Sequence, residues 1–285
     1  MSGAPGEPVG DAAERSRRAL RTERHLRILE HVSEHGGADV TALAAWLDVS
    51  SATVRRDLQY LNDQRMLQRT HGGAVSGDAG VELPLRRRAG RFHAEKRAIA
   101  AAAVELVPED AVVGLTGGTT TTEIARLLAA RGPVTIVTNA VNIAAEMVPH
   151  SQVRLVMTGG HARSRTFELV GPAAEKMLAE HHTDITFLGV DGISVRRGCT
   201  THDPLEAATD RAFLASTAQA VVVTDHSKVG KATFARICPV SAVRRLITSA
   251  APDADGPTAD ELADELASLR DSGVVVTAAS TAPTT

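Results

Sequence analysis

Aromatic residues, cysteine and long apolar runs are all scarce in this chain of 285 residues. Aromatic residues make up only 2% of it, which argues against a stacking platform for single-stranded nucleic acid. Cys199 and Cys238 are too few and too far apart in sequence to indicate a disulfide framework or a metal site, so we expect a chance pair of buried thiols. No apolar run approaches the length of a membrane span, and we therefore predict no membrane partner.

The N-terminus has no hydrophobic stretch of the signal-peptide type. We interpret residues 1–20, which are polar and rich in glycine, proline, alanine and arginine, as a disordered leader of a cytoplasmic protein. The net charge of −3 does not favour nucleic acid, yet residues 14–72 hold ten arginines against eight acidic residues, a net charge of +2. So mild a charge predicts that DNA affinity needs several copies of the chain, as a homo-oligomer (dimer or tetramer).

Residues 50–58, which read Ser-Ser-Ala-Thr-Val-Arg-Arg-Asp-Leu, predict a DNA-recognition helix. Ser50 can cap the N-terminus of this helix, and the spacing of Val54, Leu58 and Leu61 gives it one buried face. The side chains left facing outward on the first two turns are Ser51, Thr53, Arg55 and Arg56. Hydroxyl groups hold DNA phosphates, and arginine forks read guanine edges in the major groove.

The flanking sequence supports a winged helix-turn-helix domain over residues 21–76. An apolar stripe over residues 26–32 predicts a helix that stops at Gly36 and Gly37, and residues 41–49 predict a short second helix. Residues 66–75 predict a two-stranded hairpin with glycines at its bend, which would form the wing. On that wing we expect Arg69 and His71 to contact double-stranded DNA.

Two adjacent arginines on a helix usually mark nothing more than a solvated face. Here they stand within three predicted helices, a Ser-x-Thr-x-Arg-Arg front and a Gly-Gly wing. That context favours the DNA-binding interpretation over the solvated face.

A connector is predicted over residues 77–92, opening with Gly77-Asp78-Ala79-Gly80. Its arginines, Arg86, Arg87, Arg88 and Arg91, form a basic cluster. We favour a solvated linker charge run over a contact with the DNA backbone. Residues 93–106 then predict an alanine-rich helix that ends near Pro108.

Residues 93–278 alternate short β-branched runs with helical stretches, which predicts a mainly parallel α/β sheet with helices on both faces. The predicted strands cover residues 111–115, 134–138, 153–157, 185–190, 220–224, 244–248 and 273–277. The fold class predicted for the whole chain is therefore a two-domain α/β protein. We expect residues 279–285 to be a disordered tail.

Polar and glycine residues follow these strands, and the carboxyl ends of parallel strands meet at one edge of the sheet. The first strand is followed by a Gly/Thr loop and a helix N-terminus, a combination that forms an anion cradle, most naturally for a phosphate. The residues predicted to bind the ligand are Gly117, Gly118, Thr119, Thr120, Thr121, Asn139, Gly159, Gly160, Asp191, Gly192 and Lys228.

Each of these elements taken singly has a plainer explanation. The Gly-Gly-Thr-Thr loop can be an ordinary turn whose threonines cap a helix, and Lys228 can be a solvated loop lysine. Convergence at the sheet edge nevertheless favours a small-anion site. The histidines at 161, 181, 182 and 202 have no ligand-like spacing with acids or cysteines, so we predict no metal and no cofactor.

Both halves of the chain resemble the DeoR family of bacterial transcriptional regulators. In the first half the matching motifs are Thr53-Val54-Arg55-Arg56-Asp57-Leu58 and His71-Gly72-Gly73-Ala74. In the second half they are Gly118-Thr119-Thr120, Val137-Thr138-Asn139, Gly159-Gly160, Gly171-Pro172, Phe187-Leu188-Gly189 and Asp225-x-Ser227-Lys228. The resemblance implies an effector domain with the fold of ribose-5-phosphate isomerase, and a phosphorylated sugar or related metabolite as effector. It also implies that Asp57 ties its helix to its own domain rather than facing DNA.

The chain departs from the family pattern where Thr116-Gly117 replaces Asp-Ser and where Asp210 replaces a lysine.

Our leading hypothesis is a ligand-responsive regulator, a repressor of a carbohydrate-metabolism operon, with no catalytic residues. One alternative is a sugar-phosphate isomerase fused to a DNA-binding module, with Asp191, Asp210 and Lys228 as acid/base groups. Another is a regulator that has lost its ligand.

Overall fold

The computed structural model describes residues 21, 23–25, 27–29, 31–32, 37–63, 67–70, 72–75, 84–89, 92–249 and 257–281. They belong to two compact units, Met1–Val81 and Glu82–Thr285. None of the described helices combines the length and the hydropathy that crossing a bilayer requires.

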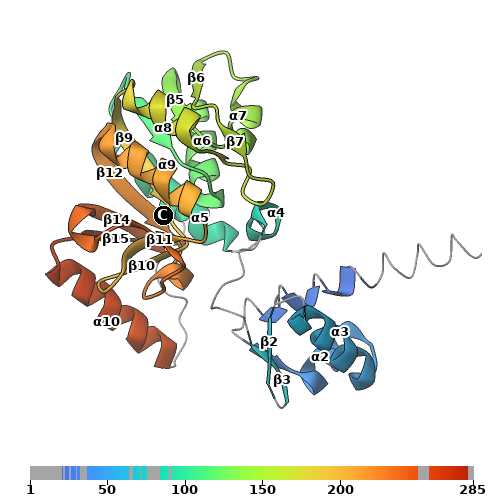
Figure 1. Cartoon of the computed structure of the whole chain (residues 1–285). Helices are drawn as coiled ribbons and strands as arrows, with labels where there is room; N and C mark the ends of the chain where they lie inside the picture. The colour runs from blue at the N-terminus through green and yellow to red at the C-terminus, as the bar shows by residue number, and fades with distance from the viewer. Residues whose placement is uncertain are drawn as a thin grey trace, which may run out of the picture. The chain divides into compact units, whose positions relative to one another are not determined.

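The first unit is a winged helix-turn-helix, as predicted (Figure 1). Its described residues between 21 and 32 are helical, and α2 (Val40–Leu47) and α3 (Ser51–Asp63) follow. The wing hairpin consists of β2 (Gln68–Arg69) and β3 (Gly73–Val75), which pair antiparallel. The buried core of this unit comprises Ile28, Val32, Leu43, Leu47, Val54, Leu58, Leu61, Leu67 and Ala74.

The wing has a third strand that the sequence did not predict. Gly37, expected as a helix stop, begins β1 (Gly37–Asp39), which pairs antiparallel with β3. The two strands approach so closely at Gly73 that a Cβ atom there would lie 2.0 Å from the carbonyl oxygen of Ala38. The glycine is therefore required for the wing to pack against β1.

The second unit contains the predicted parallel sheet. Its strands are β4 (Val112–Leu115), β5 (Val134–Thr138), β6 (Val153–Met157), β9 (Thr183–Gly189), β12 (Thr217–Thr224), β14 (Arg245–Ser249) and β15 (Val275–Ala279). The strand order is β15-β14-β12-β9-β4-β5-β6, and every neighbouring pair is parallel. The last strand includes Ala279, so the sheet extends one residue into the segment that we expected to be a tail.

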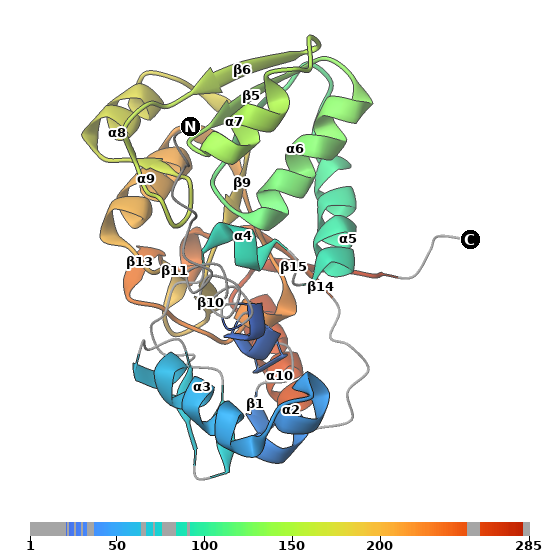
Figure 2. The same ribbon diagram turned by 90° about the vertical axis from the view of Figure 1, so that its right-hand side faces the viewer.

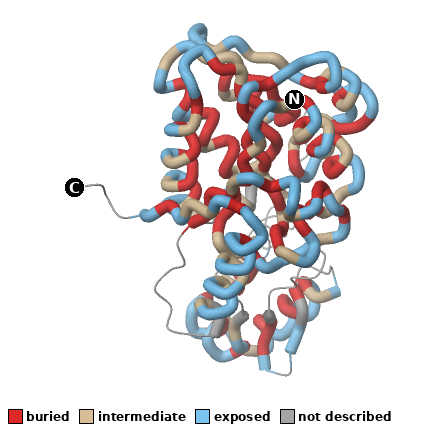
Figure 3. The backbone as a smooth tube through the Cα atoms, turned by 90° about the vertical axis from the view of Figure 1, so that its left-hand side faces the viewer, coloured by how far each residue is buried: buried red, intermediate tan, exposed pale blue. Residues whose placement is uncertain are grey.

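Helices cover both faces of this sheet (Figure 2). One face packs against α5 (His93–Val104), α6 (Thr119–Arg131) and α7 (Val141–Met147), and the other against α8 (Pro172–Ala179), α9 (Pro204–Ala215) and α10 (Pro257–Asp271). Alternation along a strand supplies both faces: Phe187 points to the first and Leu188 to the second. Burial is accordingly concentrated in the strands, with the outer helix surfaces exposed (Figure 3).

Short antiparallel strands add a second sheet, which the sequence pattern did not reveal. This sheet consists of β10 (Gly192–Ser194), β11 (Gly198–Thr201) and β13 (Ala235–Cys238), and a further hairpin joins β7 (His161–Ala162) to β8 (Leu169–Val170). Within it, Cys199 and Cys238 are register partners on neighbouring strands. Both thiols are free and buried, as expected, but their wide separation in sequence does not hold in space.

The expected connector over residues 77–92 contains an element of its own, the short helix α4 (Leu85–Arg88). Leu85 is buried, and its backbone N–H donates to the carbonyl oxygen of Arg165 at 2.9 Å. The end of the connector is therefore folded onto the second unit rather than being a solvated charge run.

Candidate DNA-binding surface and effector site

The N-terminus of α3 is built as the recognition-helix prediction requires. Ser50 caps the helix: its Oγ accepts from the backbone N–H of Thr53 at 3.2 Å and lies 2.9 Å from the Thr53 hydroxyl. Arg55 and Arg56 are exposed, while Ser51 is half-buried. The buried face consists of Val54, Asp57, Leu58 and Leu61.

Asp57 fixes α3 to the first helical segment of the unit, which contains Arg24 and His25. Its carboxylate accepts from Arg24 Nε at 2.6 Å and Arg24 Nη2 at 3.1 Å, and lies 2.8 Å from His25 Nε2. Burial raises the pKa of Asp57, but the hydrogen bonds from Arg24 and His25 lower it by more, so the net pKa is below its ordinary value. Asp57 therefore ties its helix to its own domain, as the family resemblance implied.

The wing holds one predicted contact residue beside α3. The backbone N–H of Arg69 donates to Asn62 Oδ1 at 3.0 Å, and the Arg69 guanidinium donates to the Gln59 side chain. Arg69 is exposed and oriented by two residues of α3. His71, the other predicted wing contact, lies outside the described residues.

The effector unit has a topological switch point between β4 and β9. The chain proceeds from β4 outward to β5 and β6, then returns to β9 on the other side of β4 and proceeds outward to β12, β14 and β15. The two strand ends are joined directly, because the backbone N–H of Gly189 donates to Thr116 Oγ1 at 2.9 Å. Crevices at such points are where open α/β sheets bind ligands.

The Gly/Thr segment after β4 is more helical than predicted. Gly118, with φ 142°, is the N-cap of α6, so the predicted ligand residues Thr119, Thr120 and Thr121 lie in the first helical turn. The Thr121 hydroxyl donates to the Gly118 carbonyl oxygen at 3.0 Å, so it does not cap the free backbone N–H groups of the first turn. The helix N-terminus still presents backbone N–H groups and a positive dipole end.

Glu168, which the sequence analysis did not select, packs against this segment. A Cβ atom at Gly117 would lie 2.2 Å from the Glu168 carboxyl carbon, so the glycine is needed for this approach. Asn139 Nδ2 donates to Glu168 Oε2 at 3.1 Å, which brings a second predicted residue to the same place. Asn139 Oδ1 is buried without a hydrogen-bond partner among the described residues.

Three glycines of the predicted ligand set, Gly159, Gly160 and Gly192, differ in burial and in their backbone surroundings. A Cβ atom at Gly160 would lie 2.7 Å from the carbonyl oxygen of Val170, and one at Gly192 would lie 2.6 Å from that of Lys231. Gly159 and Gly160 are exposed, and Gly192 is buried within β10. Gly160 and Gly192 therefore allow close backbone approaches, whereas a Cβ atom at Gly159 would meet nothing within 4 Å.

Asp191 and Lys228 are brought together after β9 and β12. Lys228 Nζ lies 3.1 Å from Asp191 Oδ1 and donates to the carbonyl oxygen of Val190 at 2.8 Å. A third residue joins them, because Arg88 Nη1 lies 2.9 Å from the same Asp191 oxygen. Burial raises the pKa of Asp191, but Lys228 and Arg88 lower it by more, so this carboxylate stays ionised.

The sequence analysis also missed a network of buried acidic groups beside Asp191. Thr201 Oγ1 lies 3.2 Å from Asp191 Oδ2 and 2.9 Å from Glu206 Oε2, and its one hydrogen can be donated to either oxygen. The other oxygen of Glu206 accepts from Thr166 at 2.6 Å and is ion-paired with Arg163. None of these residues directly follows a strand of the main sheet. The search for polar residues at the carboxyl ends of strands, which selected Asp191, therefore did not select them.

Two carboxyl groups of this region are shifted towards the neutral form. Burial raises the pKa of Glu168 well above its ordinary value, and repulsion by Glu206 raises it further. Burial and the charge of Glu168 do the same for Asp210, whose Oδ1 atom is buried without a hydrogen-bond partner. Over the described ranges, no three His, Cys, Asp or Glu side chains are grouped so as to hold a metal ion.

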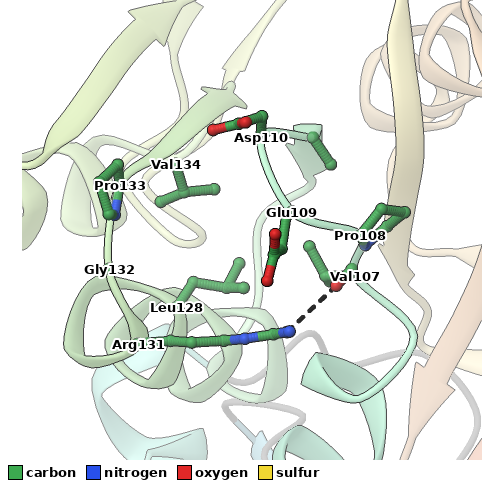
Figure 4. Close-up of a pocket in the computed structure, with 10 residues that line it drawn as sticks. Val107, Pro108, Glu109, Asp110, Leu128, Arg131, Gly132, Pro133 and Val134 are labelled. Atoms are coloured by element: carbon green, nitrogen blue, oxygen red, sulfur yellow. Dashed lines mark hydrogen bonds between the residues drawn. The ribbon is translucent and has the colours of Figure 1, made fainter.

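A separate cleft of about 290 Å³ lies near the opposite, amino ends of β4 and β5 (Figure 4). Arg131 extends across it, and its Nη1 donates to the carbonyl oxygens of Val104 at 2.9 Å and Val107 at 3.1 Å. The guanidinium thus caps the C-terminal end of α5. None of the predicted ligand residues lines this cleft.

Comparison with known families matches both units. Residues 24–79 match the DeoR-like helix-turn-helix domain, and residues 91–250 match the DeoR C-terminal sensor domain. Among solved structures, ribose 5-phosphate isomerase A from Methanocaldococcus jannaschii is 21% identical with a TM-score of 0.36, over 47% of this chain and 52% of that chain. So low a likeness says nothing about activity.

Curated relatives span almost the whole chain. The HTH-type transcriptional regulator GlpR of Haloferax volcanii is 37% identical over 83% of this chain and 92% of that protein. The glycerol-3-phosphate regulon repressor of Escherichia coli K12 is 31% identical over 81% of this chain and 92% of that protein. These relatives are regulators rather than enzymes, which decides against the isomerase alternative. The chain belongs to the DeoR family of DNA-binding transcriptional regulators.

Proposed function

We propose that this regulator represses a carbohydrate-metabolism operon and releases its operator when a phosphorylated metabolite binds the second unit. The observation that carries the proposal is the cluster at the switch point. There, two cations, Arg88 and Lys228, share one carboxylate at the carboxyl edge of the sheet. A cationic pair beside a helix N-terminus suits an anionic ligand.

On the DNA side, α3 enters the major groove of a double-stranded operator. Arg55 and Arg56 read base edges, while Ser51 and Thr53 hold phosphates at the helix N-terminus. Arg69, oriented by Gln59 and Asn62 of α3, extends this surface onto the wing. His71 belongs to the same proposed contact set.

On the effector side, the phosphate lies between the first turn of α6 and the side chains of Arg88 and Lys228. The predicted set from Gly117 to Thr121 supplies backbone N–H groups, and Asn139 has an unused acceptor for a ligand hydroxyl. The remaining residues of the proposed ligand set are Gly159 and Gly160, which are exposed, and Asp191 and Gly192.

A phosphate ester is also consistent with the relatives. One of them is named as the repressor of a glycerol-3-phosphate regulon. Glycerol 3-phosphate is a phosphate monoester of a polyol, and a site with buried carboxyl groups suits ligand hydroxyls as hydrogen-bond donors. The departure at Asp210 sets the present chain apart in the acidic part of the site.

The protein works in the cytoplasm as a homo-oligomer, a dimer or tetramer. The DNA-binding region carries a net charge of only +2 over residues 14–72, so one copy has little non-specific affinity for DNA. Two copies on a repeated operator supply the missing affinity through effective concentration. The proposed domain limits are residues 21–76 for the winged helix, 77–92 for the connector and 93–278 for the effector domain.

The test is a fluorescence-anisotropy titration of the full chain against its own upstream intergenic DNA at fixed salt. It is repeated with glycerol 3-phosphate and a panel of sugar phosphates. Sequence-selective binding that one compound relieves is the expected result. Selective binding that no compound changes would favour a regulator that has lost its ligand, and an absence of selective binding would contradict the DNA-binding proposal.

A further inference from the structure

Arg88 belongs to the effector site although it comes from the connector. It ends α4, which lies beside α5 (Figures 1 and 2), and Lys96 Nζ donates to the carbonyl oxygen of Arg88 at 2.6 Å. The other end of α4 is held by the Leu85 N–H bond to Arg165. The guanidinium therefore approaches the sheet edge from the segment that leads to the DNA-binding unit.

A single carboxylate oxygen holds both cations of the site. Asp191 Oδ1 lies 2.9 Å from Arg88 Nη1 and 3.1 Å from Lys228 Nζ. The side chains of Arg88, Asp191 and Lys228 are 16%, 11% and 25% exposed, so the cluster is reachable from solvent. Asp191 thus holds the two cations as a small anion would.

The ion pair with Asp191 leaves part of the hydrogen-bonding capacity of the Arg88 guanidinium unsatisfied. Its Nε atom is buried and has no hydrogen-bond partner among the described residues. Guanidinium groups bind oxyanions best through two parallel N–H···O bonds. A phosphate monoester carries about −1.5 to −2 charges and three acceptor oxygens, so two of its oxygens can accept from the parallel Nε–H and Nη2–H bonds of Arg88 while the third accepts from Lys228.

We propose that Arg88 is an effector-binding residue, and that a phosphate monoester replaces the Asp191 carboxylate as the partner of Arg88 and Lys228. This inference rests on the proposed function and deepens it, because it names the residue through which the ligand reaches the connector. When phosphate takes the place of Asp191 as the partner of Arg88, α4 is anchored through the ligand instead of through Asp191. Since α4 lies within the connector and precedes α5, ligand binding acts on the segment that leads to the winged helix.

The experiment measures binding of inorganic phosphate to the full chain by isothermal titration calorimetry. Phosphate replaces chloride in the buffer, so the ionic strength stays constant. Four variants are compared: Arg88→Ala, Arg88→Lys, Asp191→Asn and Arg97→Ala. Arg97, an exposed arginine on α5, is the matched control for loss of one positive charge from the same unit. Circular dichroism melts establish that each variant is folded.

We expect Arg88→Ala to weaken phosphate binding about 10- to 100-fold, the size of one or two lost bonds to a charged group. Arg88→Lys keeps the charge but not the fork, and should lose less affinity. Asp191→Asn removes the competing anion and should bind phosphate more tightly than the wild type. Arg97→Ala should bind as the wild type does.

If Arg88 and Asp191 only hold the fold together, Asp191→Asn should not bind phosphate more tightly than the wild type. The inference is overturned if Arg88→Ala keeps wild-type affinity, if Asp191→Asn gains none, or if the wild-type chain binds no phosphate. Acetate in place of phosphate tests a carboxylate ligand, and tighter binding of acetate would overturn the phosphate assignment. If Arg88→Ala does not fold, the comparison of Arg88→Lys with Asp191→Asn carries the test.

The same variants separate this inference from the proposed function. Operator binding is measured for each by anisotropy, with and without the compound that relieves wild-type binding. We expect Arg88→Ala to bind the operator and to lose the response. An operator-binding wild type whose response persists in Arg88→Ala would contradict the role of Arg88 alone, whereas a wild type without operator binding would contradict the regulator.

Discussion

Neighbouring residues on α3 have opposite surroundings, and the helical period is the reason. Arg55 and Arg56 are exposed, whereas Asp57, one residue later, is buried at 3% exposure. A helix turns about 100° per residue, so a run of three charged residues is divided between solvent and core. The acidic member of the run is therefore compensated inside its own unit by Arg24 and His25.

At this scale we predict that Asp57→Ala destabilises the DNA-binding unit. The change leaves the partly buried Arg24 guanidinium without its carboxylate, and breaking such a pair costs about 3 kcal/mol. Urea denaturation followed by the fluorescence of Trp46, the single tryptophan of the chain, reports on this unit. An unchanged midpoint would show that the ion pair adds no net stability.

Arg55→Ala should act on DNA and not on the fold. Arg55 is exposed on α3, so its removal leaves the core intact, while one lost base contact weakens operator binding by about 1–3 kcal/mol. Anisotropy with the specific operator and with an unrelated duplex measures the effect. Equal affinity of the variant and the wild type for the operator would remove Arg55 from the recognition surface.

At the scale of elements, two short strands bring together residues that the sequence keeps apart. Cys199 on β11 and Cys238 on β13 are Cα partners, and their side chains are hydrogen-bonded to one another. That bond raises the pKa of the Cys199 thiol and lowers that of Cys238. Directly opposed residues of antiparallel strands lie within the Cα separation that a disulfide spans.

We predict that oxidation by diamide joins Cys199 and Cys238 in an intrachain disulfide. Both protons and both electrons pass to the diamide, which becomes the hydrazine. Thiol titration in denaturant should fall from two groups to none, and the closed loop should stabilise the unit by up to about 4 kcal/mol. Cys238→Ser is the control; a disulfide-linked dimer of the wild type would contradict the prediction.

At the scale of the whole molecule, the proposed effector site gathers ionisable groups from both halves of the second unit. Glu168 precedes α8, Glu206 and Asp210 lie on α9, and Arg88 comes from the connector. Burial and mutual repulsion raise the pKa of Glu168 and of Asp210 well above their ordinary values. At a pH between the ordinary and the folded pKa, each group is therefore more protonated in the native state than in the unfolded chain.

This raised pKa predicts a stability that falls as pH rises. The stabilising contribution is fully present below the ordinary carboxyl pKa of about 4 and is lost as pH rises through the folded pKa. The slope reaches about 1.4 kcal/mol per pH unit for each group. Asp57, Asp191 and Asp225 have lowered pKa values, so their contributions are lost only as pH falls below the ordinary range.

Urea denaturation of the wild type and of the double variant Glu168→Gln, Asp210→Asn between about pH 5 and pH 8 checks this. The double variant has no carboxyl groups to ionise at these two positions, so its free energy of unfolding should fall less steeply over the window. Parallel curves for the two proteins would contradict the raised pKa values.

The sequence by itself determined the recognition helix, the strands of the parallel sheet and the family. Helical spacing of Val54, Leu58 and Leu61 placed α3, and the β-branched runs placed all seven strands of the parallel sheet, because burial of periodic apolar side chains is a local signal. The rule that ligands meet the carboxyl ends of strands likewise found Asp191 and Lys228, which the structure brings together.

Only the tertiary structure decided which charged side chains meet. Arg88 looked like one of several linker arginines, and Glu168 and Glu206 did not directly follow any of the strands that the sequence predicted. Arg88 and Asp191 are 103 residues apart, so no local pattern relates them. Their contact follows from where the chain returns to the sheet at the switch point, and the charges of Lys228 and Arg88 keep the pKa of Asp191 below its ordinary value despite burial.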